Sequence, residues 1–284
     1  MTTSEYPIDP ETENSAVMAE LFAAIGFQIT DERSYNWLVE YVDNNGARTR
    51  AQRGEATLHG RCWKLSDGLE VWSILYERGA EFYYADCRPA FRSRYVRAIL
   101  PWELIEYDED GEAIVRGSIE EGPEVVFELQ NLTEINQNVF RQTHLHVALA
   151  GLAYAASVAP YDDSVLAAKH LRRFEPSESL EECADDACEN DYLISGSVLA
   201  WRDIENPMTD SPLVWVYIDA GKIRLEVLIN RRALRGEIKI GAMISASIWL
   251  QGHVLVDADI SARYEGVDRD YEPGDFWNKL RRGN

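Results

Sequence analysis

The clearest pattern in the chain is a two-residue alternation of apolar and polar positions between Tyr192 and Val256. In the run from Ile223 to Ile229, every second residue is Ile, Leu or Val, while Arg224 and Glu226 face the other way. The alternation predicts four strands, at Leu193–Trp201, Pro212–Ile218, Lys222–Ile229 and Ala242–Val256. Gly236, Gly241 and Gly252 suit the kinks that let a short sheet curl closed, so we expect a small β-barrel.

These four strands and the turn around Arg231–Glu237 resemble the five-stranded OB barrel, with the place of one strand left open. The resemblance implies a module that binds single-stranded nucleic acid or oligosaccharide, or one that docks a protein. The chain as a whole resembles uncharacterised bacterial proteins more than any enzyme family.

The first half of the chain opens with helical patterns. Asn14–Phe27 carries apolar residues at helical spacing, and a second helix with Ser34 as its N-cap is expected to end at Asn44–Gly46. From Thr57 the period changes to two, which predicts a run of strands. They lie at Thr57–Leu65, Leu69–Glu77, Ala80–Cys87, Tyr95–Glu106, Ala113–Ile119 and Glu124–Leu132. The Ala-rich stretch Asn136–Ser157 and the stretch Ser164–Phe174 then predict two further helices.

Together these elements predict an α+β protein, with an N-terminal antiparallel sheet and flanking helices followed by the OB-like barrel. The expected organisation is a tail at 1–14, an α+β domain at 15–174, an acidic connector at 175–191, the barrel at 192–260 and a tail at 261–284. At 284 residues the chain is of suitable length for two domains.

The charge is strongly negative and unevenly spread. The net charge is −21, and residues 1–150 contribute −13 of it. Residues 174–191 contain eight acidic and no basic side chains, whereas residues 192–256 carry +1. Such a field disfavours nucleic acid and anionic membranes over most of the surface and would attract a basic partner.

The barrel nevertheless contains one locally basic segment, Arg231 to Arg235. We select as candidate residues for binding nucleic acid or a partner Arg224, Arg231, Arg232, Arg235, Lys239 and Trp249. Single-strand binding requires such a basic groove together with exposed aromatic rings that stack on bases. The simpler interpretation is a solvated loop that pairs with the acidic connector at 175–191, and tryptophans in strands are more often core than platform.

The remaining chemistry argues against a catalytic or metal site. Cys62, Cys87, Cys183 and Cys188 are too few for a disulfide framework and do not form paired zinc-ligand spacings. No phosphate-binding glycine loop, nucleophile elbow or dinucleotide fingerprint is present. Because the N-terminus also has no secretory signal, we expect a cytoplasmic protein without cofactor or metal.

Three hypotheses of function follow. The first is a non-catalytic interaction protein whose acidic surface binds a protein partner, either basic or a second copy of this chain. The second is a single-strand nucleic-acid binder that uses the Arg231 cluster. The third is an enzyme whose site is scattered in sequence, which would require a cleft lined with perturbed titratable groups.

Overall fold

The structure, a computed structural model, describes residues 20–107, 111–159, 172–177 and 189–255. It is mostly β, with 61% strand, 12% helix and two large sheets. The expected α+β class with flanking helices is therefore wrong. The expected tails at 1–14 and 261–284, residues 14–19 of the stretch Asn14–Phe27 and residues 164–171 of the stretch Ser164–Phe174 lie outside the described residues, whereas residues 20–24 are helical as predicted.

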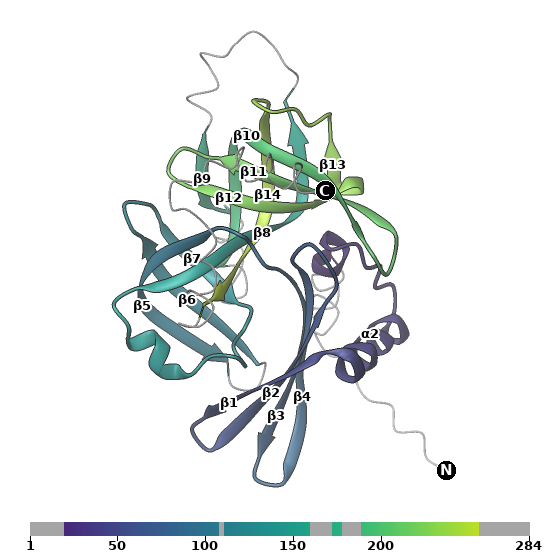
Figure 1. Cartoon of the computed structure of the whole chain (residues 1–284), viewed down its shortest axis with the longest axis vertical. Coiled ribbons are helices and arrows are strands. Elements are labelled where there is room, and N and C mark those ends of the chain that lie inside the picture. The colour runs from purple at the N-terminus through teal and green to yellow at the C-terminus, as the bar shows by residue number, and fades with distance from the viewer. Residues whose placement is uncertain (1–19, 108–110, 160–171, 178–188, 256–284) are drawn as a thin grey trace, which may run out of the picture.

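The first sheet is an antiparallel meander of four strands in sequence order (Figure 1). Its strands are β1 (Ala47–Arg53), β2 (Ala56–Lys64), β3 (Leu69–Arg78) and β4 (Glu81–Phe91). Asp67 and Gly68 adopt positive φ angles of 50° and 89° in the turn between β2 and β3, which suits an Asp-Gly pair. The predicted hairpin is confirmed, whereas β1 was not predicted.

One helix, α2 (Glu32–Asn45), packs against this sheet through the buried Leu38 and Val42. Its N-cap is Asp31, three residues before the predicted Ser34. The Asp31 carboxylate accepts the Ser34 backbone N–H at 2.7 Å, and the Ser34 hydroxyl accepts the Asp31 N–H in return. Ser34 therefore completes the capping box, and the helix ends before Gly46 as predicted.

The second sheet contains the remaining strands. They are β5 (Val96–Tyr107), β6 (Glu112–Ile119), β7 (Glu124–Leu129), β8 (Leu145–Val158), β9 (Arg173–Pro176), β10 (Asp191–Asn206), β11 (Ser211–Asp219), β12 (Arg224–Asn230), β13 (Leu234–Arg235) and β14 (Met243–Val254). Two short 3-10 helices, η1 (Gln137–Arg141) and η4 (Arg231–Ala233), interrupt them.

The pairings of this sheet close two five-stranded rings. One ring runs β8–β12–β11–β10–β14 and returns to β8; we call it the C-terminal barrel. The other runs β8–β5–β6–β7–β14 and returns to β8; we call it the middle barrel. The long β8 and β14 strands belong to both, and Figure 1 shows the middle barrel beside the C-terminal barrel, with β1–β4 beneath.

The shared strand β8 replaces most of the helix predicted at Asn136–Ser157. Five alanines lie between Leu145 and Val158, and this composition favoured the helical interpretation. In the structure Leu145, Val147 and Leu149 alternate into the barrel cores with His146 and Ala148 between them. Pairing with β14 along its length decides the conformation, because intrinsic propensity is weaker than tertiary packing.

The C-terminal barrel has five strands as expected, but its fifth strand comes from outside the stretch 192–260. That strand is β8, which precedes the connector at 175–191 in the sequence. A barrel that closes only with an upstream strand is not the self-contained module expected from the alternation. Residues 189–191 of the connector are described, and Asp191 already pairs with β14.

The two larger of three apolar clusters in the described residues hold the molecule together. The first fills both barrels and includes the inward residues Ile244, Ile248 and Leu250 of β14. The second lies between the outside of the C-terminal barrel, the N-terminal helical residues and β3–β4. Trp249 belongs to this second core and is only 5% exposed, so it is not available as a stacking platform.

Buried arginines join the β1–β4 sheet to the middle barrel. Arg88 of β4 pairs with Asp86 at 2.6 Å and with Glu128 of β7. Arg53 of β1 pairs with Glu106 at 2.8 Å and donates to the carbonyl of Leu132 at 2.8 Å. Because removing one member of a buried pair leaves an uncompensated charge, these contacts fix how the two sheets sit together.

A part-buried carboxylate links the walls of the C-terminal barrel. The Tyr154 hydroxyl of β8 donates to Asp191 of β10 at 2.9 Å. Burial raises the pKa of Asp191 to about 6, and the Tyr154 hydrogen bond offsets only part of this effect. The folded protein therefore binds the Asp191 proton more tightly than the unfolded chain, whose carboxyl has its ordinary pKa near 4.

Replacing Asp191 by Asn is expected to stabilise the protein at neutral pH. Because its pKa is raised in the folded state, Asp191 contributes fully to the free energy of unfolding below about pH 4. This contribution is lost as the pH rises through about 6. The free energy of unfolding of Asp191→Asn should thus match that of the wild type near pH 4 and exceed it by about 2 kcal/mol at pH 7. Urea unfolding across this range measures the difference. Glu205→Gln, which removes an exposed carboxylate of β10, is the control, and a constant difference at all pH values would contradict the assignment.

Candidate functional site

A groove of about 490 Å³ lies on the outer face of the C-terminal barrel, over β8, β14 and β10. We call it the outer groove. Its lining includes small side chains, one leucine and three arginines: Ala155, Ser157, Arg173, Leu193, Ser195, Arg232, Ala233, Arg235, Ser245 and Ser247.

Strand register brings the polar groups of the outer groove into one row. Across the neighbouring strands β13, β8, β14, β10 and β9, Arg235 lies opposite Ser157, Ser157 opposite Ser245, Ser245 opposite Ser195, and Ser195 opposite Arg173. Residues directly opposite one another share a face of the sheet. Since neighbouring strands are about 4.8 Å apart, the two arginine Cα atoms lie at most about 19 Å apart. Three hydroxyls therefore lie between two guanidinium groups.

The charges around this row are only lightly neutralised. Within the described residues, neither Arg232 nor Arg235 forms an ion pair. Arg173 pairs with Glu175 at 2.9 Å, but both side chains are about half exposed, and such surface pairs contribute little. Ser195 and Ser245 share a hydrogen bond of 2.6 Å, which orders the floor. The outer groove is thus a cationic channel with a floor of small polar side chains.

The structure separates the candidates selected from the sequence. Arg232 and Arg235 line the outer groove. Arg231 instead donates to Asp203 at 3.1 Å, and its guanidinium lies 5.8 Å from the centre of the Trp201 ring. Arg231 is therefore already engaged by its own barrel.

The other three candidates do not join the groove. Arg224 begins β12 at the end remote from Arg231, roughly 20 Å away along the strand. Lys239 is exposed and pairs with Glu237 at 3.0 Å. Trp249 is buried in the second core, as described above.

Sequence reasoning missed Arg173 and the serines of the floor. Arg173 fell within a stretch predicted to be helical, so its place in a strand beside β10 was not foreseen. The signal for the serines was present in the alternation of β14, where Ser245 and Ser247 separate Ile244, Ala246 and Ile248. An outward face of small hydroxyls in an otherwise apolar strand indicates a surface kept free of bulky side chains.

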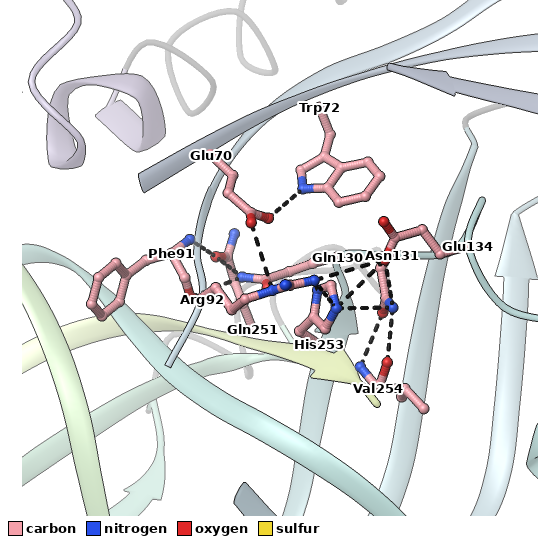
Figure 2. A network of polar contacts seen from close by, with 10 residues as sticks. All are labelled: Glu70, Trp72, Phe91, Arg92, Gln130, Asn131, Glu134, Gln251, His253 and Val254. Atoms are coloured by element: carbon pink, nitrogen blue, oxygen red, sulfur yellow. Dashed lines mark hydrogen bonds and ion pairs between the residues drawn. The ribbon is translucent and has the colours of Figure 1, made fainter. Parts of the chain in front are cut away.

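A second polar region lies at the far end of β14, where the barrels meet the β1–β4 sheet. Figure 2 shows its side chains converging from β3, β4, the segment after β7 and β14. Gln251 accepts the backbone N–H of Phe91 at 3.2 Å and donates to the Pro89 carbonyl at 3.0 Å. Gln130 donates to Gln251 at 2.6 Å and to the Phe91 carbonyl at 3.2 Å. These amides supply hydrogen bonds to the β4 backbone where it meets the barrel.

Asn131 fixes the end of β14 in the same region. Its side-chain amide donates to the Val254 carbonyl at 2.8 Å, and its carbonyl accepts the Val254 N–H at 3.0 Å. It also donates to Glu134 at 3.2 Å. Two backbone groups that would end a strand unpaired are thereby satisfied inside the protein.

Arg92 is the cation of this network. Its guanidinium donates to the ring of the buried His253 and lies 3.6 Å from Glu70 and 3.8 Å from Glu134 (Figure 2). Glu70 in turn accepts the indole N–H of Trp72 at 3.1 Å. Burial raises the pKa of the Glu134 carboxyl above its ordinary value. The Arg92 side chain is 22% exposed, so its guanidinium is held by the network and still reaches solvent.

Removing the Gln251 amide is expected to destabilise the junction. In Gln251→Leu the Phe91 N–H and the Pro89 carbonyl lose a buried partner, and each such loss costs about 1–3 kcal/mol. We expect the free energy of unfolding to fall by roughly 2–4 kcal/mol in urea titrations. Ser247→Ala, on the same face of β14 but in the groove, should stay within about 0.5 kcal/mol of the wild type. Equal changes in the free energy of unfolding for the two variants would show that the Gln251 amide does not stabilise the junction.

Comparison with known proteins finds a similarity over part of the chain. Residues 186–252 match the model of a family described as a domain of unknown function from E. rectale, DUF3881. The match covers the strands β10 to β14 and does not include β8. No curated protein and no solved structure matches the chain. In the part of the chain that the structure describes, no helix could span a membrane and no group of three or more His, Cys, Asp or Glu side chains could hold a metal ion.

Proposed function

We propose that the protein is a non-catalytic interaction protein, and that the outer groove binds an acidic segment of a protein partner. The observation that carries the proposal is the row from Arg235 through Ser157, Ser245 and Ser195 to Arg173. An extended peptide laid across the row would place carboxylates at both rims, where guanidinium groups pair with them in a bidentate manner. Its backbone would lie over the hydroxyls of the floor.

The small floor supports an extended polypeptide as ligand. Alanine and serine side chains keep the surface low, so a strand can approach β14 closely, and serine hydroxyls both donate and accept hydrogen bonds. Among the described residues, the lining contains two large apolar side chains, Leu193 and Ile194, and Ile194 is only 1% exposed. Affinity in such a groove would come from the charged rims and backbone hydrogen bonds rather than from an apolar pocket.

An acidic peptide fits the outer groove better than single-stranded nucleic acid does. Sequence-tolerant binding of single strands depends on aromatic side chains that stack on the bases. Among the described residues no aromatic side chain lines the groove, and Trp215, Tyr217 and Trp249 are each no more than 5% exposed. Net charge alone favours a basic partner, whereas the cationic rims of the groove favour an acidic one.

The chain itself contains a segment of the required chemistry. Residues 174–191 carry eight carboxylates and no cation, so a second copy of this protein is one source of an acidic partner. A labelled peptide with the sequence of residues 177–190, its cysteines replaced by serine, is therefore a suitable probe.

We expect this peptide to bind saturably in fluorescence anisotropy, and the triple variant Arg173→Gln, Arg232→Gln, Arg235→Gln to lose most of the affinity. Each charge-assisted hydrogen bond lost should weaken binding about tenfold. The matched control is Arg224→Gln with Lys239→Gln, which removes two exposed cations away from the groove and should bind normally.

Two results would reject the proposal. One is an equal loss of affinity in the control variant, which would show attraction by overall charge. The other is tight binding of a labelled oligothymidylate with no binding of the peptide, which would favour a nucleic-acid binder. Unfolding curves of all variants exclude misfolding as the cause.

A further inference from the structure

A second pocket, of about 370 Å³, opens at the edge of the β1–β4 sheet. It is lined by Thr49, Arg50, Lys64, Arg92, Asn131, Thr133 and Glu134, and we call it the edge pocket. Arg92, Asn131 and Glu134 also belong to the network of Figure 2, so the edge pocket adjoins a rigid, hydrogen-bonded wall. It is separate from the outer groove, with which it shares no lining residue.

Three cations face this pocket against one carboxylate. Arg50 comes from β1 and Lys64 from the end of β2, and within the described residues neither forms an ion pair. Arg92 is the third and shares Glu134 with His253. With Glu134 ionised, the lining carries a net charge of about +2. Arg92 is itself balanced by Glu70 and Glu134. The excess charge therefore belongs to Arg50 and Lys64, and two such cations gathered in one concave site favour an anion.

Two hydroxyls complete the lining. Thr49 of β1 and Thr133 of the segment after β7 are hydrogen-bonded to each other at 2.7 Å. Such a pair has two hydroxyl hydrogens and uses one internally, so the other is available to donate to a ligand oxygen. Gly60 makes room for the pair, because a Cβ at that position would lie 2.1 Å from the Thr133 hydroxyl oxygen and 2.2 Å from that of Thr49.

The surrounding sequence carries the same sign. Residues 47–97, which form the β1–β4 sheet and the approach to β5, contain ten basic and six acidic side chains. This part of the chain is therefore +4 in a protein whose total is −21. The edge pocket lies in the most basic part of an acidic molecule.

We propose that the edge pocket binds a small dianion, of the kind presented by a phosphate monoester or a dicarboxylate. The charge of the lining matches two negative charges, and Arg50 of β1, Lys64 of β2 and Arg92, which follows β4, approach from different segments, as a tetrahedral or branched anion requires. The volume is near the lower limit of pockets for small molecules, which excludes a folded partner.

The network prepares Arg92 for this role. Glu70, Glu134 and His253 hold the guanidinium in place before a ligand arrives, and Asn131 ties the Glu134 side chain to the end of β14. Less side-chain freedom is then lost on binding, which raises affinity for a given set of contacts.

Isothermal titration calorimetry with inorganic phosphate and with succinate tests the proposal, at constant ionic strength set with sodium chloride. The wild-type protein should bind at least one of the two saturably, and the comparison distinguishes a phosphoryl from a carboxylate ligand. Arg50→Gln and Lys64→Gln should each weaken binding about tenfold, since each removes one charge-assisted contact. Gly60→Ala should also weaken it, because its Cβ displaces the two hydroxyls.

Arg48→Gln is the matched control, because Arg48 is an exposed cation of β1 that does not line the edge pocket. It should bind the dianion as the wild type does. The proposal is overturned if neither dianion binds saturably, or if Arg48→Gln weakens binding as much as Arg50→Gln. Arg50 and Lys64 lie on exposed strand positions, so these two variants remain informative even if Gly60→Ala unfolds.

Discussion

The pairing of β8 with β14 is the constraint on which the rest of the molecule depends. The two strands run antiparallel from Ile244 opposite Val158 to Val254 opposite Val147, and each barrel closes on this common wall. A barrel leaves no free strand edges, but it requires the hydrogen bonds of every wall strand to be satisfied on both sides. Two barrels can share a wall only if both shared strands are long enough to change neighbours along their length. β8 does so by pairing with β5 near its start and with β12 and β13 further on.

Successive residues on the outward face of β14 then lie in three different environments. Inward residues of both barrels occupy alternate positions, which leaves Ser245, Ser247, Trp249, Gln251 and His253 facing outward. The serines form the floor of the outer groove, Trp249 packs under the N-terminal helical residues, and Gln251 and His253 enter the polar network of Figure 2. A strand that serves as wall for two barrels thus also places the floor of the outer groove, an apolar contact and an anchored junction in one line.

The sequence predicted most individual strands and α2, but it did not predict which strands close the barrels. The strands β2 to β7, β10, β11, β12 and β14 follow from alternation, and α2 with its C-terminal end, though not its N-cap, from local signals, because these signals act over a few residues. β8 could not be recognised in the same way, since its alanines favour a helix and only pairing with β14 selects the strand. Because β8 was predicted to be a helix, the fifth strand of the C-terminal barrel was missed as well. Arg232 and Arg235 were found as part of a basic run, whereas Arg173 joins them only through the register of β9 with β10.

In the proposed function, local charge and not net charge selects the partner, for a related reason. At physiological ionic strength the Debye length is about 8 Å, so exposed carboxylates elsewhere on a molecule of 284 residues are largely screened from a ligand in either pocket. What such a ligand senses are the side chains within one or two strands of it. These are Arg173, Arg232 and Arg235 in the outer groove, and Arg50, Lys64 and Arg92 in the edge pocket. An acidic protein can therefore carry two cationic sites, provided that the fold gathers its few cations from strands far apart in sequence.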